Sequence, residues 1–109
     1  LVGMARAKEL TMLGVPLTAS EAHQMGLIHR SVADDKWEEE VHTLAMRLAQ
    51  MPTKGLGLTK RALHESMGNS LQDQLSLELD LQFQAAEPKD YAEGVQAFLD
   101  KRRPQFTGT

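Results

Sequence analysis

KWEEEVHTLAMRLAQ, residues 36–50, is the stretch with the clearest periodicity in this chain of 109 residues. Its apolar residues fall at i, i+4, i+7, i+8 and i+11, a spacing that places them on one face of a helix; they are Trp37, Val41, Leu44, Ala45 and Leu48. Acidic residues gather at its start, where the helix dipole favours negative charge. Pro52 marks its end. The stretch therefore predicts an amphipathic helix.

Helix signals continue on both sides of this stretch. Thr18 and Glu21 have the spacing of a capping box, in which each side chain bonds to the backbone N–H of the other residue. Gly26 suits the left-handed residue that closes such a helix. We expect further helices at residues 2–13, 18–26, 53–67 and 89–103, a short strand at 27–32 and a frayed tail at 105–109. Gly55 and Gly57 predict close backbone packing near a helix start, because each costs about 1 kcal/mol relative to Ala.

Residues 70–83 carry two competing signals. Leu75, Leu77, Leu79, Leu81 and Phe83 alternate with polar residues, which is the strand period. The segment nevertheless lacks β-branched residues, is rich in helix formers and begins with a helix-start pair, Ser70 and Asp73. We therefore predict a helix with two apolar stripes, one at positions 71, 75 and 79 and the other at 77 and 81. Such a helix needs two partners, and the second of them could be a neighbouring subunit.

Composition excludes several classes of function. A net charge of −3 gives no reason to expect nucleic-acid binding, and no apolar run is long enough to span a membrane. The chain has no cysteine, which rules out disulfides and thiolate chemistry and fits a reducing compartment; we expect a cytoplasmic protein. Because the chain opens on Leu1, we expect a processed or truncated product.

Catalytic and metal-binding signatures are absent from the sequence. There is no nucleophile elbow, no phosphate-binding glycine loop and no metal-ligand spacing among the histidines, so we predict no metal site. The acidic run at 38–40 and the basic run at 101–103 are each typical of a solvated helix end matched to the dipole. Composition and periodicity alone predict a soluble, mainly helical, oligomeric domain.

Two motifs add a family resemblance. LTASEAHQMGLI, residues 17–28, resembles the crotonase (enoyl-CoA hydratase/isomerase) stretch in which a capped turn leads to Ala, Gly-Leu and a short strand. DYAEGVQAFLDKRRPQF, residues 90–106, is similar to the terminal helix of that superfamily, and PTKGLGLTK, residues 52–60, stands where its lysine-bearing helix lies. The finer resemblance, carried by residues 55–58, 74–82, 90–91 and 104–108, is to the branch that isomerises ring-1,2-epoxyphenylacetyl-CoA in phenylacetate degradation.

The resemblance implies an architecture and separate locations for the catalytic and the assembly residues. Residues 1–33 would end the strand–strand–helix spiral core, and residues 34–109 would form a C-terminal helical region that assembles homotrimers, often stacked as hexamers. In family order the oxyanion hole and the acid–base carboxylates precede this chain, so no catalytic residue is assigned here and the isolated chain is expected to be inactive. The alternatives are an ordinary enoyl-CoA hydratase of β-oxidation and a non-catalytic helical oligomerisation module.

The resemblance also implies one binding site. Phe98 and Lys101 match terminal-helix residues that in several members approach the adenine and phosphates of a coenzyme A held by a neighbouring subunit. An aromatic face can stack on adenine and an ammonium can pair with phosphate. Coenzyme A is then part of the acyl-CoA substrate, and no separate cofactor is expected. The alternative for Phe98 is core packing beside Tyr91 and Val95, and for Lys101 it is a solvated helix end.

Overall fold

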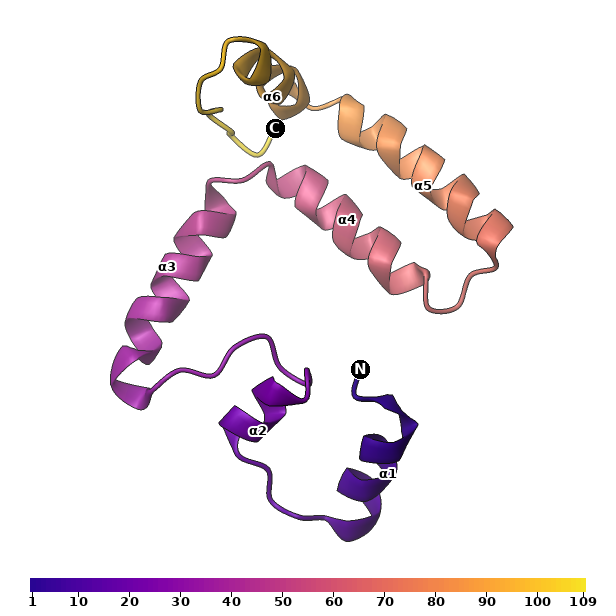
Figure 1. The fold of residues 1–109 in the computed structure, drawn as a ribbon. Coiled ribbons are helices and arrows are strands. Elements are labelled where there is room, and N and C mark those ends of the chain that lie inside the picture. Colours follow the sequence, from indigo (N-terminus) through magenta and orange to yellow (C-terminus); the bar gives the residue numbers. More distant parts are fainter. The chain divides into compact units, whose positions relative to one another are not determined.

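The computed structural model describes all 109 residues as helices, turns and connecting segments. Its α-helices are α1 (Gly3–Leu13), α2 (Ala19–Gln24), α3 (Trp37–Ala49), α4 (Thr53–Glu65), α5 (Leu71–Ala86) and α6 (Lys89–Leu99), with a 3₁₀ helix at Asp34–Lys36 (Figure 1). The mainly helical class is confirmed. The chain forms two compact units, residues 1–41 and 42–109. None of the helices combines the length and the apolar character needed to cross a bilayer.

The first unit depends on the predicted capping box. The Thr18 N–H donates to Glu21 Oε2 at 2.9 Å, and the Glu21 N–H donates to Thr18 Oγ1 at 3.3 Å. Gly26 closes α2 in the left-handed conformation, with φ 77°. Ala22, which lies in the middle of α2, is buried. Both local signals in this unit, the box and the closing glycine, are therefore confirmed.

The strand predicted at residues 27–32 is wrong. The chain there forms a turn and an irregular segment. The N–H groups of Leu27 and Ile28 donate back to the Ala22 carbonyl, at 2.9 and 3.4 Å, which closes the C-terminal end of α2. A strand also needs a neighbouring strand to satisfy its remaining N–H and C=O groups, and the chain contains no other extended segment that pairs with it.

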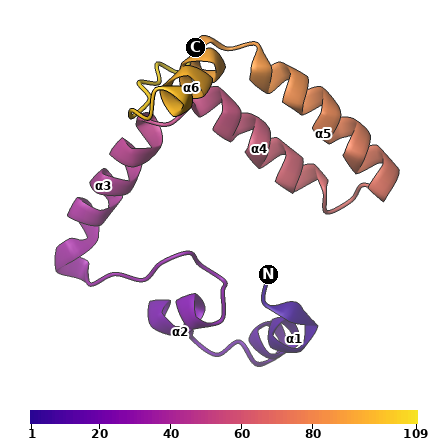
Figure 2. The ribbon, with the colours of Figure 1, turned by 45° about the horizontal axis from the view of Figure 1, so that its top comes forward.

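The second unit is built on the pairing of α4 with α5, which lie side by side in Figures 1 and 2. The predicted helix over the alternating leucines is confirmed, and the Asp73 N–H donates to Ser70 Oγ at 3.2 Å to begin it. Leu81 lies on the inner side of α5 and is only 5% exposed. Gln74 of α5 donates to the Ala62 carbonyl of α4 at 3.2 Å, which adds a polar tie between the two helices.

Several apolar faces have no covering partner within this chain. The outer stripe of α5, formed by Leu71, Leu75 and Leu79, is more than half exposed at every position. The helix predicted from residues 36–50 is confirmed as α3, but its apolar face, from Trp37 to Leu48, is also exposed. Of the second stripe, Leu81 is buried beside α4 and Leu77 is half-buried. Assembly with other copies through the exposed stripe stays a prediction.

The last helix ends earlier than predicted. We expected it to continue to Arg103, whereas α6 ends at Leu99. Lys101 adopts φ 54°, which interrupts the right-handed helix. The Arg102 N–H donates to the Ala97 carbonyl at 3.0 Å and the Lys101 N–H to the Phe98 carbonyl at 3.2 Å. These two bonds are those of a Schellman motif, which satisfies carbonyl groups that a helix end would otherwise leave free.

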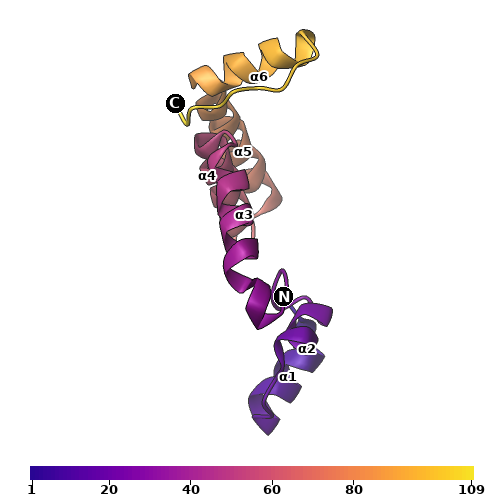
Figure 3. The ribbon, with the colours of Figure 1, turned by 90° about the vertical axis from the view of Figure 1, so that its left-hand side faces the viewer.

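The tail was predicted to be frayed, and this prediction is wrong. After Pro104 the chain runs back along α6 toward the start of that helix, as the yellow segment in Figure 3 shows. The Asp90 N–H donates to the Thr109 carbonyl at 2.9 Å, so the last residue lies beside the first turn of α6. Side chains of α6 bind other tail N–H groups, which gives the terminal residues the anchoring that an ordinary tail lacks.

Close packing around the α4 glycines is not found within this chain. A Cβ added at Gly57 would meet no atom within 4 Å, and one at Gly55 would approach only Pro52, at 4.0 Å. We therefore expect Gly57→Ala to raise the free energy of unfolding of the isolated chain by about 0.5–1 kcal/mol, because alanine restricts the unfolded state and favours helix. Urea denaturation measures this change. A loss of stability would indicate that some group packs against Gly57 after all.

Candidate functional site

Asp90 anchors the tail to the first turn of α6. Its side chain is buried, and its two oxygens accept hydrogen bonds from the N–H groups of Thr107 and Gly108, both at 2.8 Å, and from the Thr107 hydroxyl at 3.2 Å. The Thr107 N–H in particular holds the pKa of Asp90 below its usual value. Since both carboxylate oxygens are occupied by the tail, Asp90 serves here as a structural anchor rather than as an acid–base group.

Glu93 forms a second anchor one helical turn later. Its two oxygens accept from Nη1 and Nη2 of Arg102, at 2.7 and 2.9 Å, and Oε1 also accepts from the Gln105 N–H at 2.7 Å. The Arg102 hydrogen bonds and then the Gln105 N–H lower the pKa of Glu93 to about 2. The same ion pair raises the pKa of Arg102. Planar two-point pairing of this kind fixes the orientation of both groups.

The lowered pKa of Glu93 predicts how this anchor responds to acid. The folded carboxylate has a pKa of about 2 against an ordinary value of 4.5, so the pair stabilises the fold above about pH 4.5. That contribution is lost as the pH falls from 4.5 through 2. NMR titration of the Glu93 carboxyl carbon should give a midpoint near 2, and Glu93→Gln should abolish the transition. A midpoint near 4.5 would show that the pair does not form in solution.

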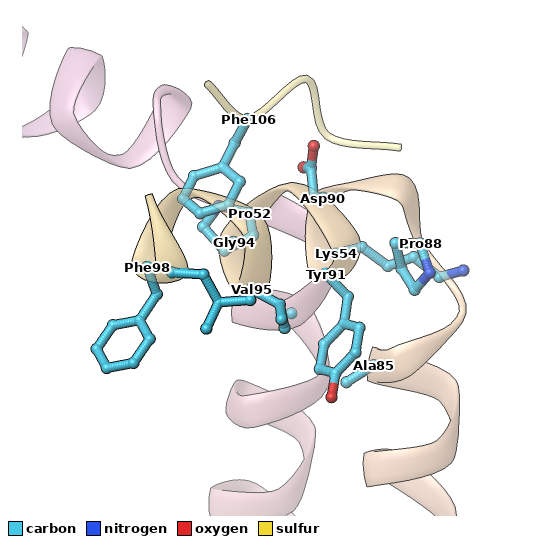
Figure 4. A pocket seen from close by; sticks show the side chains of 12 residues that line it. Pro52, Lys54, Ala85, Pro88, Asp90, Tyr91, Gly94, Val95, Phe98 and Phe106 are labelled. Carbon is cyan, nitrogen blue, oxygen red and sulfur yellow. The ribbon is translucent and has the colours of Figure 1, made fainter. Parts of the chain in front are cut away.

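An apolar groove of about 430 Å³ lies along α6 (Figure 4). Tyr91, Val95 and Phe98 line it from α6, and Pro52 and Lys54 from the start of α4. The tail contributes Phe106, whose ring covers Gly94: a Cβ at that glycine would lie 3.5 Å from Phe106 Cε1. This is an ordinary van der Waals distance, so the Phe106 ring packs against the helix at Gly94 and would still have room for a methyl group there.

The two predicted contact residues lie together at the C-terminal end of α6. Phe98 is 82% exposed, so it does not form part of a core within this chain, and its ring projects outward in Figure 4. Lys101 follows the helix and is also exposed. The Lys101 N–H bonds to the Phe98 carbonyl at 3.2 Å, which makes them neighbours in the helix-ending turn. An exposed aromatic ring can stack on a flat base, and an exposed ammonium can pair with phosphate.

Three residues that hold the tail in place were not predicted from the sequence. Asp90 and Glu93 were not singled out, and Phe106 was placed in a frayed tail. The available signal was the spacing of two acidic residues by one helical turn, followed by a proline and a Thr-Gly-Thr end that offers free N–H groups. No three His, Asp or Glu side chains group in a way that could hold a metal ion.

The whole chain matches one family model. Residues 1–109 fit the model described as enoyl-CoA hydratase/isomerase. The chain belongs to the enoyl-CoA hydratase/isomerase family, the crotonase superfamily that its motifs resemble. An enoyl-CoA hydratase of Bacillus anthracis whose structure has been solved superposes on all of the chain with a TM-score of 0.90 and 32% identity. The chain covers 42% of that structure.

Among the curated relatives, 1,2-epoxyphenylacetyl-CoA isomerase of Escherichia coli K12 is 47% identical over 108 residues. A probable enoyl-CoA hydratase of Rhodobacter capsulatus is 42% identical over 107 residues. These matches cover 99% and 98% of this chain but only 41% and 42% of the relatives. The chain therefore spans about two fifths of the length of the curated relatives that it matches.

Proposed function

We propose that this chain is the coenzyme A-contacting, self-associating C-terminal portion of an enzyme that isomerises ring-1,2-epoxyphenylacetyl-CoA. The observation that supports the substrate is the 47% identity to the isomerase of that name, which extends over nearly the whole chain. The family relationship supports acyl-CoA as the substrate class. Coenzyme A enters as part of the substrate, and we propose no separate cofactor.

The reaction itself requires groups that we do not assign to these residues. Opening the ring epoxide of an acyl-CoA calls for donors that stabilise negative charge on the thioester oxygen and for a carboxylate that moves a proton. In the family resemblance both precede this chain. Asp90 and Glu93, the carboxylates at the candidate site, are occupied by the tail and by Arg102. We therefore expect the isolated chain to turn over no acyl-CoA.

The assay that tests the substrate compares two acyl-CoA compounds. The full reading frame that contains this chain should convert ring-1,2-epoxyphenylacetyl-CoA to its oxepin isomer, and should hydrate crotonyl-CoA poorly. Efficient hydration without epoxide turnover would favour an ordinary enoyl-CoA hydratase, the second candidate, which the Rhodobacter capsulatus relative supports. Turnover of neither compound would leave a non-catalytic oligomerisation module as the remaining function.

The coenzyme A contact predicts the effect of two substitutions. Phe98→Ala in the full reading frame should weaken coenzyme A binding about tenfold or more, because stacking of a base on an aromatic ring contributes roughly 1–3 kcal/mol. Lys101→Met should weaken binding about tenfold through the loss of a charge-assisted contact to phosphate. Isothermal titration with coenzyme A measures both effects.

Each substitution has a matched control elsewhere in the same unit. Phe83→Ala removes an exposed ring from α5, and Lys60→Met removes an exposed ammonium from α4. Neither control should change the affinity for coenzyme A by more than about twofold, the usual effect of a surface substitution. Equal losses in the controls and in the site variants would refute the assignment of Phe98 and Lys101.

A further inference from the structure

Lys101 is the only residue other than glycine with a positive φ, at 54°. This conformation brings Cβ close to the backbone and is unfavourable for a residue with a side chain, which is why helices usually place glycine there. Such strain persists only where surrounding contacts fix the backbone, and it gathers at functional positions. In this chain the strained residue is also the proposed phosphate contact.

The backbone on both sides of Lys101 is fixed to α6. Its own N–H donates to the Phe98 carbonyl, and the next N–H, that of Arg102, donates to the Ala97 carbonyl at 3.0 Å. Ala97 is 1% exposed, so this acceptor lies on the buried side of α6. If Lys101 left the left-handed region, the Arg102 N–H would turn away and this bond would break. The position of Arg102 therefore determines the conformation of Lys101.

Glu93 fixes the position of Arg102. It holds the guanidinium through two hydrogen bonds, at 2.7 and 2.9 Å, and it also accepts the Gln105 N–H at 2.7 Å. Asp100 is a second, weaker carboxylate partner, at 3.4 Å from Arg102 Nε. One carboxylate on α6 thus ties down the chain at two points after Lys101. The turn that contains Lys101 is therefore held on one side by the end of α6 and on the other by the bonds to Glu93.

We propose that Glu93 is a positioning residue for coenzyme A binding: through Arg102 it holds Lys101 in the left-handed conformation, which sets the direction of the Lys101 side chain relative to Phe98. The inference rests on the proposed coenzyme A contact of Phe98 and Lys101. The φ and ψ angles of Lys101 determine the direction in which its side chain leaves the backbone. If the turn is not held, the ammonium samples many directions, and more conformational entropy is lost when it binds phosphate.

The test is a double-mutant cycle in the full reading frame. Glu93→Gln keeps the side-chain length but replaces one acceptor oxygen with an NH₂ group that faces the Arg102 guanidinium. Its effect on coenzyme A affinity is measured with Lys101 present and in the Lys101→Met background. We expect Glu93→Gln to weaken binding about fivefold in the first case and to have no further effect in the second, because residues that act through one another are not additive. Glu87→Gln replaces an exposed glutamate that follows the last residue of α5 and forms no ion pair, and it should change neither value.

Amide exchange supplies a readout of the conformation itself. Glu93→Gln should speed exchange of the Arg102 N–H, which donates to Ala97. In the Lys101→Gly background the same substitution should have little effect, because glycine adopts a positive φ without steric cost and keeps the turn closed. Faster exchange of equal size in both backgrounds would overturn the claim that Glu93 restrains Lys101.

The binding outcomes separate this inference from the proposed function. If Lys101→Met weakens binding but Glu93→Gln does not, or if Glu93→Gln has equal effects in both backgrounds, Glu93 has no positioning role while the coenzyme A contact stands. If Lys101→Met and Phe98→Ala bind coenzyme A as the unsubstituted protein does, the contact itself is wrong, and the role of Glu93 falls with it.

Discussion

Replacing Leu81 by alanine is expected to lower the free energy of unfolding by about 2–4 kcal/mol, the usual cost of removing a buried leucine side chain. Leu81 is 5% exposed and lies between α5 and α4. The only other buried apolar residues are Ala22 and Ala97, so Leu81 is the one large side chain that the chain buries by itself. Urea denaturation followed by far-ultraviolet circular dichroism measures the effect.

Leu79→Ala is the matched control for this substitution. Leu79 lies on the same helix but on its outer stripe, 58% exposed. In a monomer its replacement should change the free energy of unfolding by less than about 0.5 kcal/mol, as surface substitutions usually do. If assembled chains cover the outer stripe, Leu79→Ala should instead weaken association. Equal destabilisation of a monomer by both variants would contradict the inner and outer assignment of the two stripes.

Asp90→Asn is expected to release the tail from α6. An amide offers one acceptor oxygen in place of two and turns an NH₂ group toward the Thr107 or Gly108 N–H, which leaves one donor without a partner. Hydrogen bonds to charged groups contribute enough that exchange of these two amides should accelerate about tenfold or more. Hydrogen exchange measured by NMR, together with the rate of carboxypeptidase digestion, reports the release.

Asp80→Asn provides the comparison for Asp90→Asn. Asp80 is exposed on α5 and has no hydrogen bond to the tail, so its replacement should leave the exchange of both tail amides unchanged. Release of the tail should also expose Gly94, because the Phe106 ring covers it. Slow exchange at Thr107 and Gly108 in the Asp90→Asn protein would show that the tail is held by other contacts.

Local signals predicted the helices and their starts. The Thr18–Glu21 box, the Ser70 cap and the face from Trp37 to Leu48 all depend on residues within a turn or two of one another, so the sequence suffices for them. The prediction of a strand at residues 27–32 was wrong because a strand depends on a partner strand far away in the chain or outside it. The end of α6 was predicted wrongly because Lys101 adopts a left-handed conformation, which a sequence pattern predicts only at glycine.

For the candidate site, too, the sequence predicted some residues and not others. Phe98 and Lys101 were predicted as contact residues only through a family resemblance, and no local pattern distinguished them from a core residue and a solvated helix end. Asp90 and Glu93 looked like ordinary acidic residues in the first turns of a helix. Their tail partners, Thr107 and Gln105, lie 17 and 12 residues away, and only the folded chain brings them together.

The central claim is that this chain is the self-associating, coenzyme A-contacting portion of a larger acyl-CoA enzyme. Its most direct test is to measure the mass of the purified chain by light scattering, with and without coenzyme A. The chain has a mass of 12.1 kDa. The uncovered stripes of α3 and α5 lead us to expect assembly, and the family resemblance a discrete trimer or hexamer, with weak binding of coenzyme A that Phe98→Ala abolishes. A folded monomer that does not respond to coenzyme A would contradict both the assembly and the contact.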